Sequence, residues 1–391
     1  MAEQVLIVGG GDGGTILANS LDRRRFDVTV LAASLAHTFQ RGFLDVALRG
    51  RRPRLVRDEG RLVGSHVRLV HDRATAIDLN AGVVATAGGA RLEYDHLVIA
   101  TGMTTDPSQI PGLTEVNARF GDYHTDIAQA KKLWAHLDTF NGGTIALGQS
   151  SPICKCPPSP VEGILLIDEL LRAHGTRERT RLVFFTPYPR PYPAEGINDV
   201  VAPILEQRGV EVLPFFDVDK IDPEASTITS IEGDELHYDL PVVIPPFVGA
   251  DIAYEPGDVV DEGRFVITDK ESLRVKGSDT AFAIGDASNL PTSKAGVGAH
   301  LQAKVVAKTL AGKRATFDGR TNCSLDVGHG RATYVIGSYQ APVARAAPNR
   351  LKYVMEWLLG RFFWMSLKGT IDPVFDIYFK VTEPKAPKRQ Q

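Results

Sequence analysis

A glycine-rich turn directly after an apolar run near the first residue is the feature that most restricts how this chain folds. Residues 4–8 (QVLIV) predict a buried parallel strand, after which Gly9, Gly11 and Gly14 stand in the spacing G-x-G-x-x-G. Glycines at these positions let the backbone approach a pyrophosphate, which the N-terminus of the following helix then stabilises. The segment therefore predicts the first strand, turn and helix of a Rossmann-like domain that binds a dinucleotide.

Alternation of strands and helices begins twice in the 391 residues, near residue 4 and again near residue 142. We therefore predict an α/β fold of two Rossmann-like domains of the FAD/NAD(P)-binding type, the second inserted in the first. The expected units are an FAD-binding domain over 1–105 and 236–318, an inserted domain over 106–235, and a C-terminal region over 319–391. The main predicted strands are 4–8, 27–33, 95–103, 142–150, 181–187, 239–247 and 280–288, and the main helices 13–23, 126–140, 161–175, 295–312 and 349–369.

Further positions in the first unit point to FAD as the dinucleotide. Thr101 and Gly102 end a strand that returns toward the nucleotide, and Gly285 and Asp286 end another strand and open a helix. A carboxylate at that point can bind a ribose or ribityl hydroxyl, although an ordinary helix N-cap is the alternative for Asp286. The second predicted strand ends in VTVLAAS, without the usual acidic residue, so we expect the ribose contact from backbone or from Ser34.

The loop at the corresponding point of the second unit reads GQSSPICKCPPSP and cannot serve the same purpose. A pyrophosphate needs glycines there, and only Gly148 is present, so the loop argues against NAD(P)H binding. It places Cys154 and Cys156 where a nicotinamide cofactor would dock, and the third cysteine, Cys323, lies far downstream. Zinc takes three or four ligands, so this set, with no histidine nearby, predicts no metal site.

The segment 349–369 (NRLKYVMEWLLGRFFWMSLKG) has apolar residues at helical spacing, aromatic bulk and flanking basic residues. These properties are typical of a helix that lies in a membrane interface, although a helix that covers a domain or forms a dimer is the alternative. No stretch of about 18 apolar residues predicts a spanning helix, and the N-terminus lacks the regions of a secretory signal. We expect a peripheral, monotopic protein of the cell membrane. Its net charge of −3 gives no sign of nucleic-acid binding.

These motifs together resemble the sulfide:quinone oxidoreductase and flavocytochrome c sulfide dehydrogenase group of the flavin disulfide-reductase superfamily. The resemblance covers nearly the whole chain. The specific markers are CPPSPVE and the distant cysteine in TNC, whereas the glycine turn and AFAIGDASNLPTSKAG belong to the superfamily at large. The other matching segments are VIATG, IPPFVGA and RFFWMSLKG.

The resemblance assigns roles to particular residues of this chain. Cys156 and Cys323 match the pair that forms a redox disulfide or polysulfide bridge beside FAD, and Glu162 matches the acid/base near the sulfur. Lys294 matches the lysine that faces the flavin pyrimidine ring. The alternatives are an exposed first-turn glutamate for Glu162 and a solvated surface lysine for Lys294. The aromatic residues that the resemblance brings near the quinone and the membrane are Phe362, Phe363 and Trp364.

Two segments of the chain depart from the pattern of that group, and Cys154 has two alternative roles. The segment GDYHTD (121–126) holds no cysteine where many sulfide:quinone oxidoreductases have a third one, and 37–43 lacks the proline common there. If the loop is extended, the side chains of Cys154 and Cys156 lie on the same face, and Cys154 serves as an auxiliary thiol. The alternative is that Cys154 is a small buried residue that fills space in the apolar core.

The sequence thus predicts an enzyme in which hydrosulfide attacks the Cys156–Cys323 bridge and the electrons pass through FAD to a membrane quinone. Sulfide, the quinone and the membrane surface are the expected partners, and a homo-oligomer is compatible with the sequence. The alternatives are a sulfide dehydrogenase subunit that reduces a cytochrome c, a type II NADH:quinone oxidoreductase, and a flavin-binding redox sensor without turnover.

Overall fold

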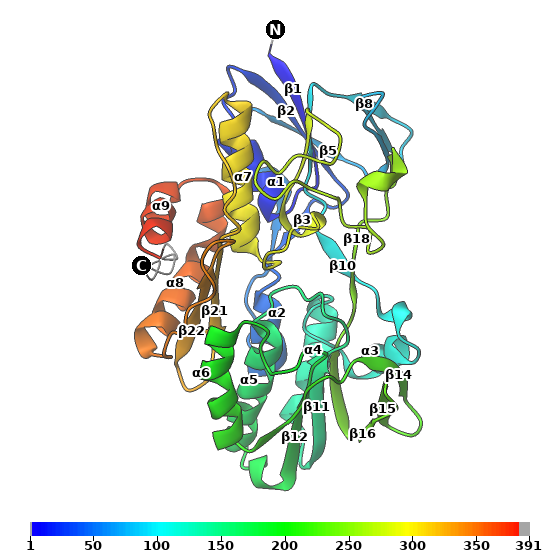
Figure 1. The fold of residues 1–391 in the computed structure, drawn as a ribbon, viewed down its shortest axis with the longest axis vertical. Helices are drawn as coiled ribbons and strands as arrows, with labels where there is room; N and C mark the ends of the chain where they lie inside the picture. The colour runs from blue at the N-terminus through cyan, green and yellow to red at the C-terminus, as the bar shows by residue number, and fades with distance from the viewer. Residues whose placement is uncertain (1, 383–391) are drawn as a thin grey trace, which may run out of the picture.

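A parallel sheet built from both ends of the chain forms the upper half of the molecule in the computed structural model, which describes residues 2–382 (Figure 1). Its strands run in the order β20-β9-β1-β2-β5. Val5, Ile7 and Val98 are fully or almost fully buried, as expected for strands covered on both faces. The strands are β1 (Glu3–Val8), β2 (Phe26–Ala32), β5 (Val67–His71), β9 (His96–Ile99) and β20 (Ala281–Ala283).

Two helices cover one face of this sheet and bring the start of the chain against a late segment. Helix α1 (Asp12–Ser20) packs along α7 (Gly296–Leu310), as Figure 1 shows. Ile16 and Leu17 of α1 share a buried cluster with Ala303 and Val306 of α7. The glycine turn at the start of α1 therefore lies beside the loop that precedes α7.

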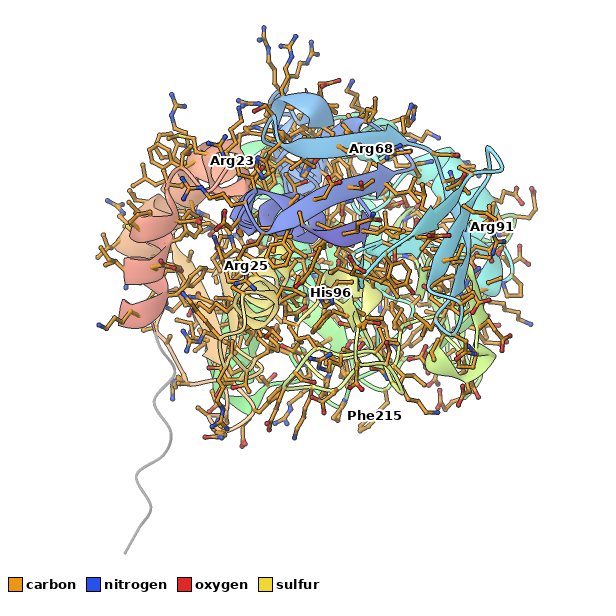
Figure 2. The ribbon with its side chains drawn as sticks, turned by 90° about the horizontal axis from the view of Figure 1, so that it is seen from above. Arg23, Arg25, Arg68, Arg91, His96 and Phe215 are labelled. Atoms are coloured by element: carbon orange, nitrogen blue, oxygen red, sulfur yellow. The ribbon has the colours of Figure 1, made fainter. Side chains whose placement is uncertain are left out.

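The other face carries a smaller sheet, antiparallel except that β19 is parallel to β6, and an antiparallel pair of strands links the two halves of the molecule. The smaller sheet has the order β19-β6-β7-β8, while β10 pairs with β18 where the chain passes between the halves. Figure 2, seen from above, shows the strands around Arg91 on the side opposite the C-terminal helices. These strands are β6 (Ala74–Asp78), β7 (Val83–Thr86), β8 (Arg91–Glu93), β10 (Met103–Thr105), β18 (Phe247–Gly249) and β19 (Ala253–Glu255).

A second parallel sheet, in the order β13-β12-β11-β17, forms the lower half of the molecule (Figure 1). Phe184 and Phe185 of its strand β12 are almost completely buried, and a separate small antiparallel sheet has the order β14-β15-β16. The elements are α3 (Leu113–Phe120), α4 (Ile127–Asp138), β11 (Gly143–Gln149), α5 (Ser159–Ala173), β12 (Thr180–Phe185), α6 (Glu195–Gln207), β13 (Val210–Leu213), β14 (Val218–Asp222), β15 (Thr227–Ser230), β16 (Glu235–His237) and β17 (Leu240–Ile244).

The C-terminal segment packs along the side where the two halves meet. Hairpin β21 (Thr321–Asp326) and β22 (Ala332–Gly337) contacts α5 and α7 through β21, and α8 (Arg350–Leu367) packs on β22 and α1. Helix α9 (Asp372–Val381) follows, and no helix within residues 2–382 is long and apolar enough to cross a membrane. The last part of the predicted C-terminal region, residues 383–391, lies outside the described residues.

The predicted elements agree with the observed ones within a few residues, with three exceptions of interest. The run 95–103 divides into β9, which ends at Ile99, and β10, which begins at Met103 and belongs to another sheet. The run 239–247 divides into β17 and β18 because Pro245 and Pro246 interrupt the strand. The Gly285–Asp286 turn opens only a short 3₁₀ turn, Gly285–Ala287, and α7 begins later at Gly296. Asp286 is therefore not the N-cap of α7. The remaining short elements are β3 (Ala36–Thr38), α2 (Gly42–Arg49) and β4 (Val56–Asp58).

Candidate active site

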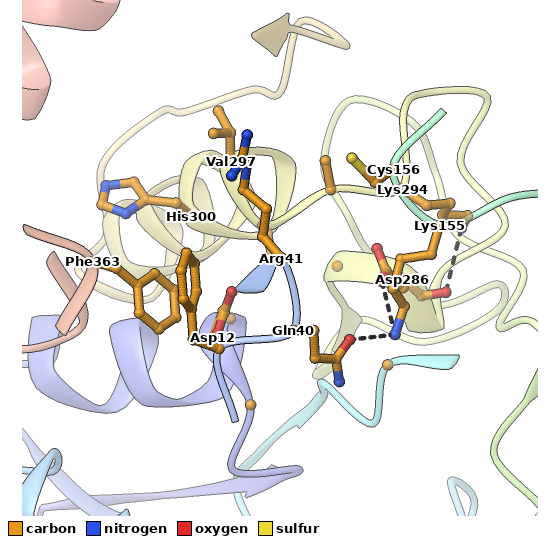
Figure 3. A pocket seen from close by; sticks show the side chains of 18 of the residues that line it. Asp12, Gln40, Arg41, Lys155, Cys156, Asp286, Lys294, Val297, His300 and Phe363 are labelled. Carbon is orange, nitrogen blue, oxygen red and sulfur yellow. Dashed lines mark hydrogen bonds and ion pairs between the residues drawn. The ribbon is translucent and has the colours of Figure 1, made fainter. Parts of the chain in front are cut away.

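One cavity of about 560 Å³ lies where both parallel sheets, α7 and the C-terminal helices come together. Its lining includes the glycine turn after β1, the segment 33–44, the loop before α5, the start of α7, β21, α8 and α9. Figure 3 shows Cys156 and Lys155 on one side of Arg41, and His300 and Phe363 on the other. The cavity therefore has a sulfur end and an aromatic end.

The glycine turn forms a cradle that a dinucleotide pyrophosphate fits. A Cβ added at Gly9 would lie 2.3 Å from the carbonyl oxygen of Ala100, and one at Gly14 would lie 2.0 Å from the carbonyl oxygen of Gly9. These two glycines are needed for close packing of β1, β9 and α1. A Cβ at Gly11 would meet no atom within 4 Å, so Gly11 instead opens toward the cavity at the N-terminus of α1.

The remaining predicted nucleotide positions line the same cavity. Thr101, Gly102 and Ser34 are all part of its wall. The hydroxyl of Ser34 accepts a hydrogen bond from the backbone N–H of Ala36 at 3.0 Å, so it caps a turn and still has its O–H to donate. Gly102 has a φ of +70°, which favours glycine at this strand end.

Asp286 and two lysines form a charged group beside the cradle. The Asp286 carboxylate lines the cavity with Lys155 Nζ 3.9 Å away, and burial raises its pKa. Lys155 Nζ also donates to Gln40 Oε1 at 2.7 Å. Lys294 Nζ is bound to the carbonyl oxygens of Ser288 and Asp286 and lies 5.0 Å from the ring centre of Phe265. Lys294 is therefore half-buried beside the cavity and not a solvated surface lysine.

His37 forms a buried ionic cluster that no sequence pattern indicated. Its Nδ1 lies 2.6 Å from Glu59 Oε2 and its Nε2 lies 3.0 Å from Asp12 Oδ1. Burial lowers the pKa of His37, but the hydrogen bonds to both carboxylates raise it to about 9 overall. The imidazolium charge therefore offsets that of Asp12, which stands in the first turn of α1 beside the glycine cradle.

Cys156 is held at the sulfur end by an unusual backbone conformation. Its φ of +57° is in the left-handed region, and its N–H donates to the carbonyl oxygen of Lys294 at 2.7 Å. Burial raises the pKa of Cys156 well above its ordinary value, and negative charge on Glu162 and Cys323 adds to the effect. The two predicted redox cysteines, from segments far apart in the sequence, thus lie close together and both line the cavity.

Cys323 and Cys154 have different surroundings, although all three thiols are free. The Cys323 sulfur has the hydroxyls of Ser293 and Thr321 at 3.7 and 3.8 Å, which offset part of the rise in pKa caused by burial. Cys154 belongs to the apolar core and is absent from the cavity wall, and burial raises its pKa to about 12. The extended loop that would place Cys154 and Cys156 on the same face is not formed, because the left-handed φ of Cys156 turns the chain.

Glu162 is buried beside both redox cysteines, contrary to its alternative as an exposed residue. It is 1% exposed, and its Oε1 accepts a hydrogen bond from the backbone N–H of Asp326 at 2.9 Å. Burial raises the pKa of Glu162 to about 7, while Arg41, 3.6 Å away, opposes the rise. The same Arg41 guanidinium also contacts Glu356 of α8, so one cation joins the C-terminal helix to the sulfur end.

Tyr123 and His124 occupy the segment in which the third cysteine was missing. Tyr123 donates its hydroxyl to the carbonyl oxygen of Ser159 at 3.1 Å, and His124 Nε2 lies 2.6 Å from the Ser159 hydroxyl. Both rings line the cavity near Cys156. Burial lowers the pKa of His124 to about 3, so its imidazole is neutral.

The aromatic end is formed by α7, α8 and α9. Of the three predicted aromatic residues, Phe363 lines the cavity, Phe362 is exposed, and Trp364 packs against His37 and Arg57. No sequence pattern indicated the α9 residues at this end, because only the fold brings α9 beside α7. The apolar side chains of this end are Leu359, Phe363, Leu367, Phe375 and Phe379.

Comparison with known proteins assigns this architecture to a family. The model of the family described as pyridine nucleotide-disulphide oxidoreductase matches residues 3–303. The mitochondrial sulfide:quinone oxidoreductases of Mus musculus and Dictyostelium discoideum are each 26% identical, each alignment covering 88% of this chain and 80% of the relative. The crystal structure of the sulfide:quinone oxidoreductase from Aquifex aeolicus has a TM-score of 0.84 at 19% identity, covering 99% of this chain and 98% of that one.

We expect Gly11→Ala and Gly14→Ala to fail in different ways. Gly11 has φ −86°, which alanine adopts freely, and its Cβ would enter open space, so G11A should keep the fold but lose FAD affinity at least tenfold. G14A should lose about 2 kcal/mol or more of unfolding free energy, because its Cβ meets backbone. Thermal unfolding and FAD fluorescence titration measure both effects. Equal FAD affinity in G11A and the wild type would contradict the cradle.

We also expect Glu162 to make stability depend on pH. The folded protein holds this proton more tightly than the unfolded chain, so the free energy of unfolding should fall as pH rises from about 4.5 to about 7. A shift of this size corresponds to about 3 kcal/mol. Glu162→Gln should remove that loss, as measured by denaturant unfolding at pH 5, 6, 7 and 8. Exposed Glu195→Gln is the control, and parallel curves for E162Q and wild type would refute the assignment.

Proposed function

The chain belongs to the pyridine nucleotide-disulphide oxidoreductase family, and we propose that it is an FAD-dependent enzyme that oxidises sulfide to sulfane sulfur and reduces a membrane quinone. One observation carries the proposal. Two cysteines, Cys156 from the loop before α5 and Cys323 from β21, meet at the cavity that also holds the dinucleotide cradle. The curated relatives named sulfide:quinone oxidoreductase, similar over most of both chains, support the same reading.

The residues that would hold FAD are those of the cradle and the charged group beside it. Gly11 leaves room for the pyrophosphate, while Gly9 and Gly14 let β1, β9 and α1 approach closely enough to form the cradle, and Ser34 and Asp286 suit ribose and ribityl hydroxyls. When bound, FAD supplies the capacity to take up two electrons from one substrate and deliver them to another. Thr101, Gly102, Gly285 and Lys294 complete the wall on that side.

The chain's own groups can perform the sulfur step. In the oxidised enzyme hydrosulfide attacks the Cys156–Cys323 disulfide, which forms a persulfide on Cys156 and releases Cys323 as a thiolate. Glu162, with a pKa raised to about 7, accepts the proton that the persulfide gives up. The hydroxyls of Ser293 and Thr321 stabilise the Cys323 thiolate, and Arg41 adds a positive charge to this end.

We propose the inserted arrangement that the sequence predicts, with its second boundary moved beyond residue 235. The domain that begins near 106 extends through β17, which pairs with β11 in the lower sheet, while β9 and β20 are neighbours in the first sheet although the second sheet lies between them in sequence. The insertion carries Cys156 and Glu162, whereas the surrounding segments carry the FAD cradle. Residues 319–391 form the region that contacts quinone and membrane, its last nine residues lying outside the described part.

We propose that α8 and α9 attach the protein peripherally to the membrane. Their surface carries large apolar side chains in the open, each between 42% and 71% exposed, with basic residues nearby. Such a surface gains free energy in a lipid interface, and the basic residues favour anionic headgroups. The exposed apolar residues of these helices are Leu351, Val354, Trp357, Phe362, Met365, Val374 and Ile377.

Serine at either redox cysteine should stop electron transfer from sulfide. We expect C156S and C323S to slow anaerobic bleaching of the flavin absorbance by sulfide at least a hundredfold, because the disulfide can no longer form. Cys154→Ala is the matched control and should stay within about threefold of wild type, since Cys154 lies in the core and outside the cavity wall. Bleaching of the wild type by NADH but not by sulfide would favour the NADH:quinone alternative instead.

Charge placed on the exposed face of α8 and α9 should release the protein from membranes. Leu351→Glu and Ile377→Glu change side chains that are 71% and 65% exposed, so the fold should tolerate them. Each should weaken binding to anionic phospholipid vesicles about tenfold or more, as expected when a large aliphatic side chain no longer enters lipid. Ile231→Glu, also 65% exposed but in the lower half, is the matched control in vesicle sedimentation. Retention of the double variant on vesicles would disprove the attachment surface.

A further inference from the structure

His300 of α7 is a buried polar side chain at the aromatic end of the cavity. It is 5% exposed and forms part of the cavity wall, on the side of Arg41 away from Cys156 (Figure 3). Its ring lies parallel to that of Phe375 of α9, with the ring centres 5.6 Å apart, and Phe379 is 5.7 Å away. The fold thus places one imidazole among the aromatic rings of this end of the cavity.

The nitrogen atoms of His300 have no hydrogen-bond partner among residues 2–382. The other two histidines of the cavity wall do have partners, since His37 binds two carboxylates and His124 binds Ser159. The His300 side chain is enclosed by protein and its nitrogens open into the cavity, so an imidazole without a protein partner there indicates a ligand.

The other polar groups near this end are already engaged. The Ser366 hydroxyl donates to the carbonyl oxygen of Phe363 at 2.6 Å, and the Tyr378 hydroxyl donates to Asn322 Oδ1 at 3.1 Å. Lys304, one helical turn beyond His300, is bound to Asp372 and Ser20. Within the described part of the chain, His300 is therefore the group best able to hydrogen-bond a molecule in this chamber, the aromatic end of the cavity.

The imidazole of His300 is neutral near pH 7. Burial lowers its pKa to about 4, with the charge of Lys304 acting in the same direction, although Asp372, Asp376 and Asp12 act against it. A neutral imidazole offers one N–H donor and one nitrogen acceptor, whereas an imidazolium offers donors alone. The ring can therefore donate to a carbonyl oxygen and also accept from a hydroxyl.

We propose that His300 binds the quinone head group, donating its N–H to a quinone carbonyl and accepting from the hydroxyl once that oxygen is reduced. The inference rests on the proposed function, because it names a binding residue for the second substrate of that reaction. The chamber suits this class of ligand, since Phe363, Phe375 and Phe379 surround a flat apolar ring and leave the hydrogen bond to one group. His300 thereby contributes to both affinity and orientation.

The test separates the two half-reactions in the complete, FAD-loaded protein. The flavin is first reduced anaerobically with one equivalent of sulfide and then mixed with decylubiquinone in a stopped-flow spectrometer. His300→Phe keeps the ring and its stacking but removes both nitrogens, so reoxidation by decylubiquinone should slow about fivefold to tenfold, the factor expected for one lost hydrogen bond. Reduction by sulfide should stay within about twofold of wild type.

Two further variants keep the inference falsifiable. His300→Asn restores a donor and an acceptor and should recover most of the quinone rate, whereas equal losses in H300F and H300N would show a packing role and overturn the hydrogen bond. If H300F fails to retain FAD, His300→Gln and His300→Met compare a side chain that can hydrogen-bond with an apolar side chain of similar length. His71→Phe, at an exposed position at the end of β5 outside the cavity wall, is the matched control.

The outcomes also distinguish this inference from the proposed function. An unchanged reoxidation rate in H300F, with normal turnover of the wild type, overturns the role of His300 and leaves the quinone reductase intact. A wild type whose sulfide-reduced flavin is not reoxidised by decylubiquinone overturns quinone reduction itself, and with it the inference.

Discussion

The backbone hydrogen bond from Cys156 to the carbonyl oxygen of Lys294, 2.7 Å long, is the contact on which the site depends. It ties the loop after β11, which belongs to the lower sheet, to the loop before α7, which belongs to the upper one. The left-handed φ of Cys156 makes the contact geometrically possible, and Lys155 extends beside it toward Asp286 and Gln40. This contact acts together with the β10–β18 pair and the packing of β21 on α5 and α7 to hold the sulfur at a fixed position relative to the dinucleotide cradle.

A buried network of charges surrounds that contact and explains why the C-terminal helix belongs to the site. A carboxylate as deeply buried as Glu162 is costly unless cations and donors compensate it. Arg41 and the backbone N–H of Asp326 compensate the charge of Glu162. Arg49 compensates the Asp326 carboxylate, which lies 2.5 Å from its Nη2. Arg41 also binds Glu356, so the position of α8 bears on the electrostatics of the sulfur end.

Local patterns predicted the elements of the fold and the cradle, because β1, α1 and their glycines are set by residues adjacent in sequence. The family resemblance supplied Cys156, Cys323 and Glu162, which the fold brings to one cavity. Neither approach could find the Arg41–Glu356 ion pair or the cluster around His37, since those partners are joined by tertiary packing alone. His300 gave no signal for the same reason: a histidine within a helical pattern looks the same whether it faces a core or a cavity.

The distribution of charge within one cavity suits two substrates of different kinds. At the sulfur end Arg41, Lys155 and the hydroxyls beside Cys323 provide positive charge and donors, which favour the hydrosulfide anion and a thiolate. At the other end the apolar rings surround a neutral imidazole, and the cations nearby are already paired, His37 with two carboxylates and Lys304 with Asp372. An anion would therefore lose its hydration there without a free cation among the described residues to compensate it. An uncharged ring with carbonyl oxygens meets no such penalty there. The same low polarity that keeps His300 neutral therefore excludes hydrosulfide from the chamber that we assign to the quinone, so each proposed substrate is directed to its own end without a moving gate.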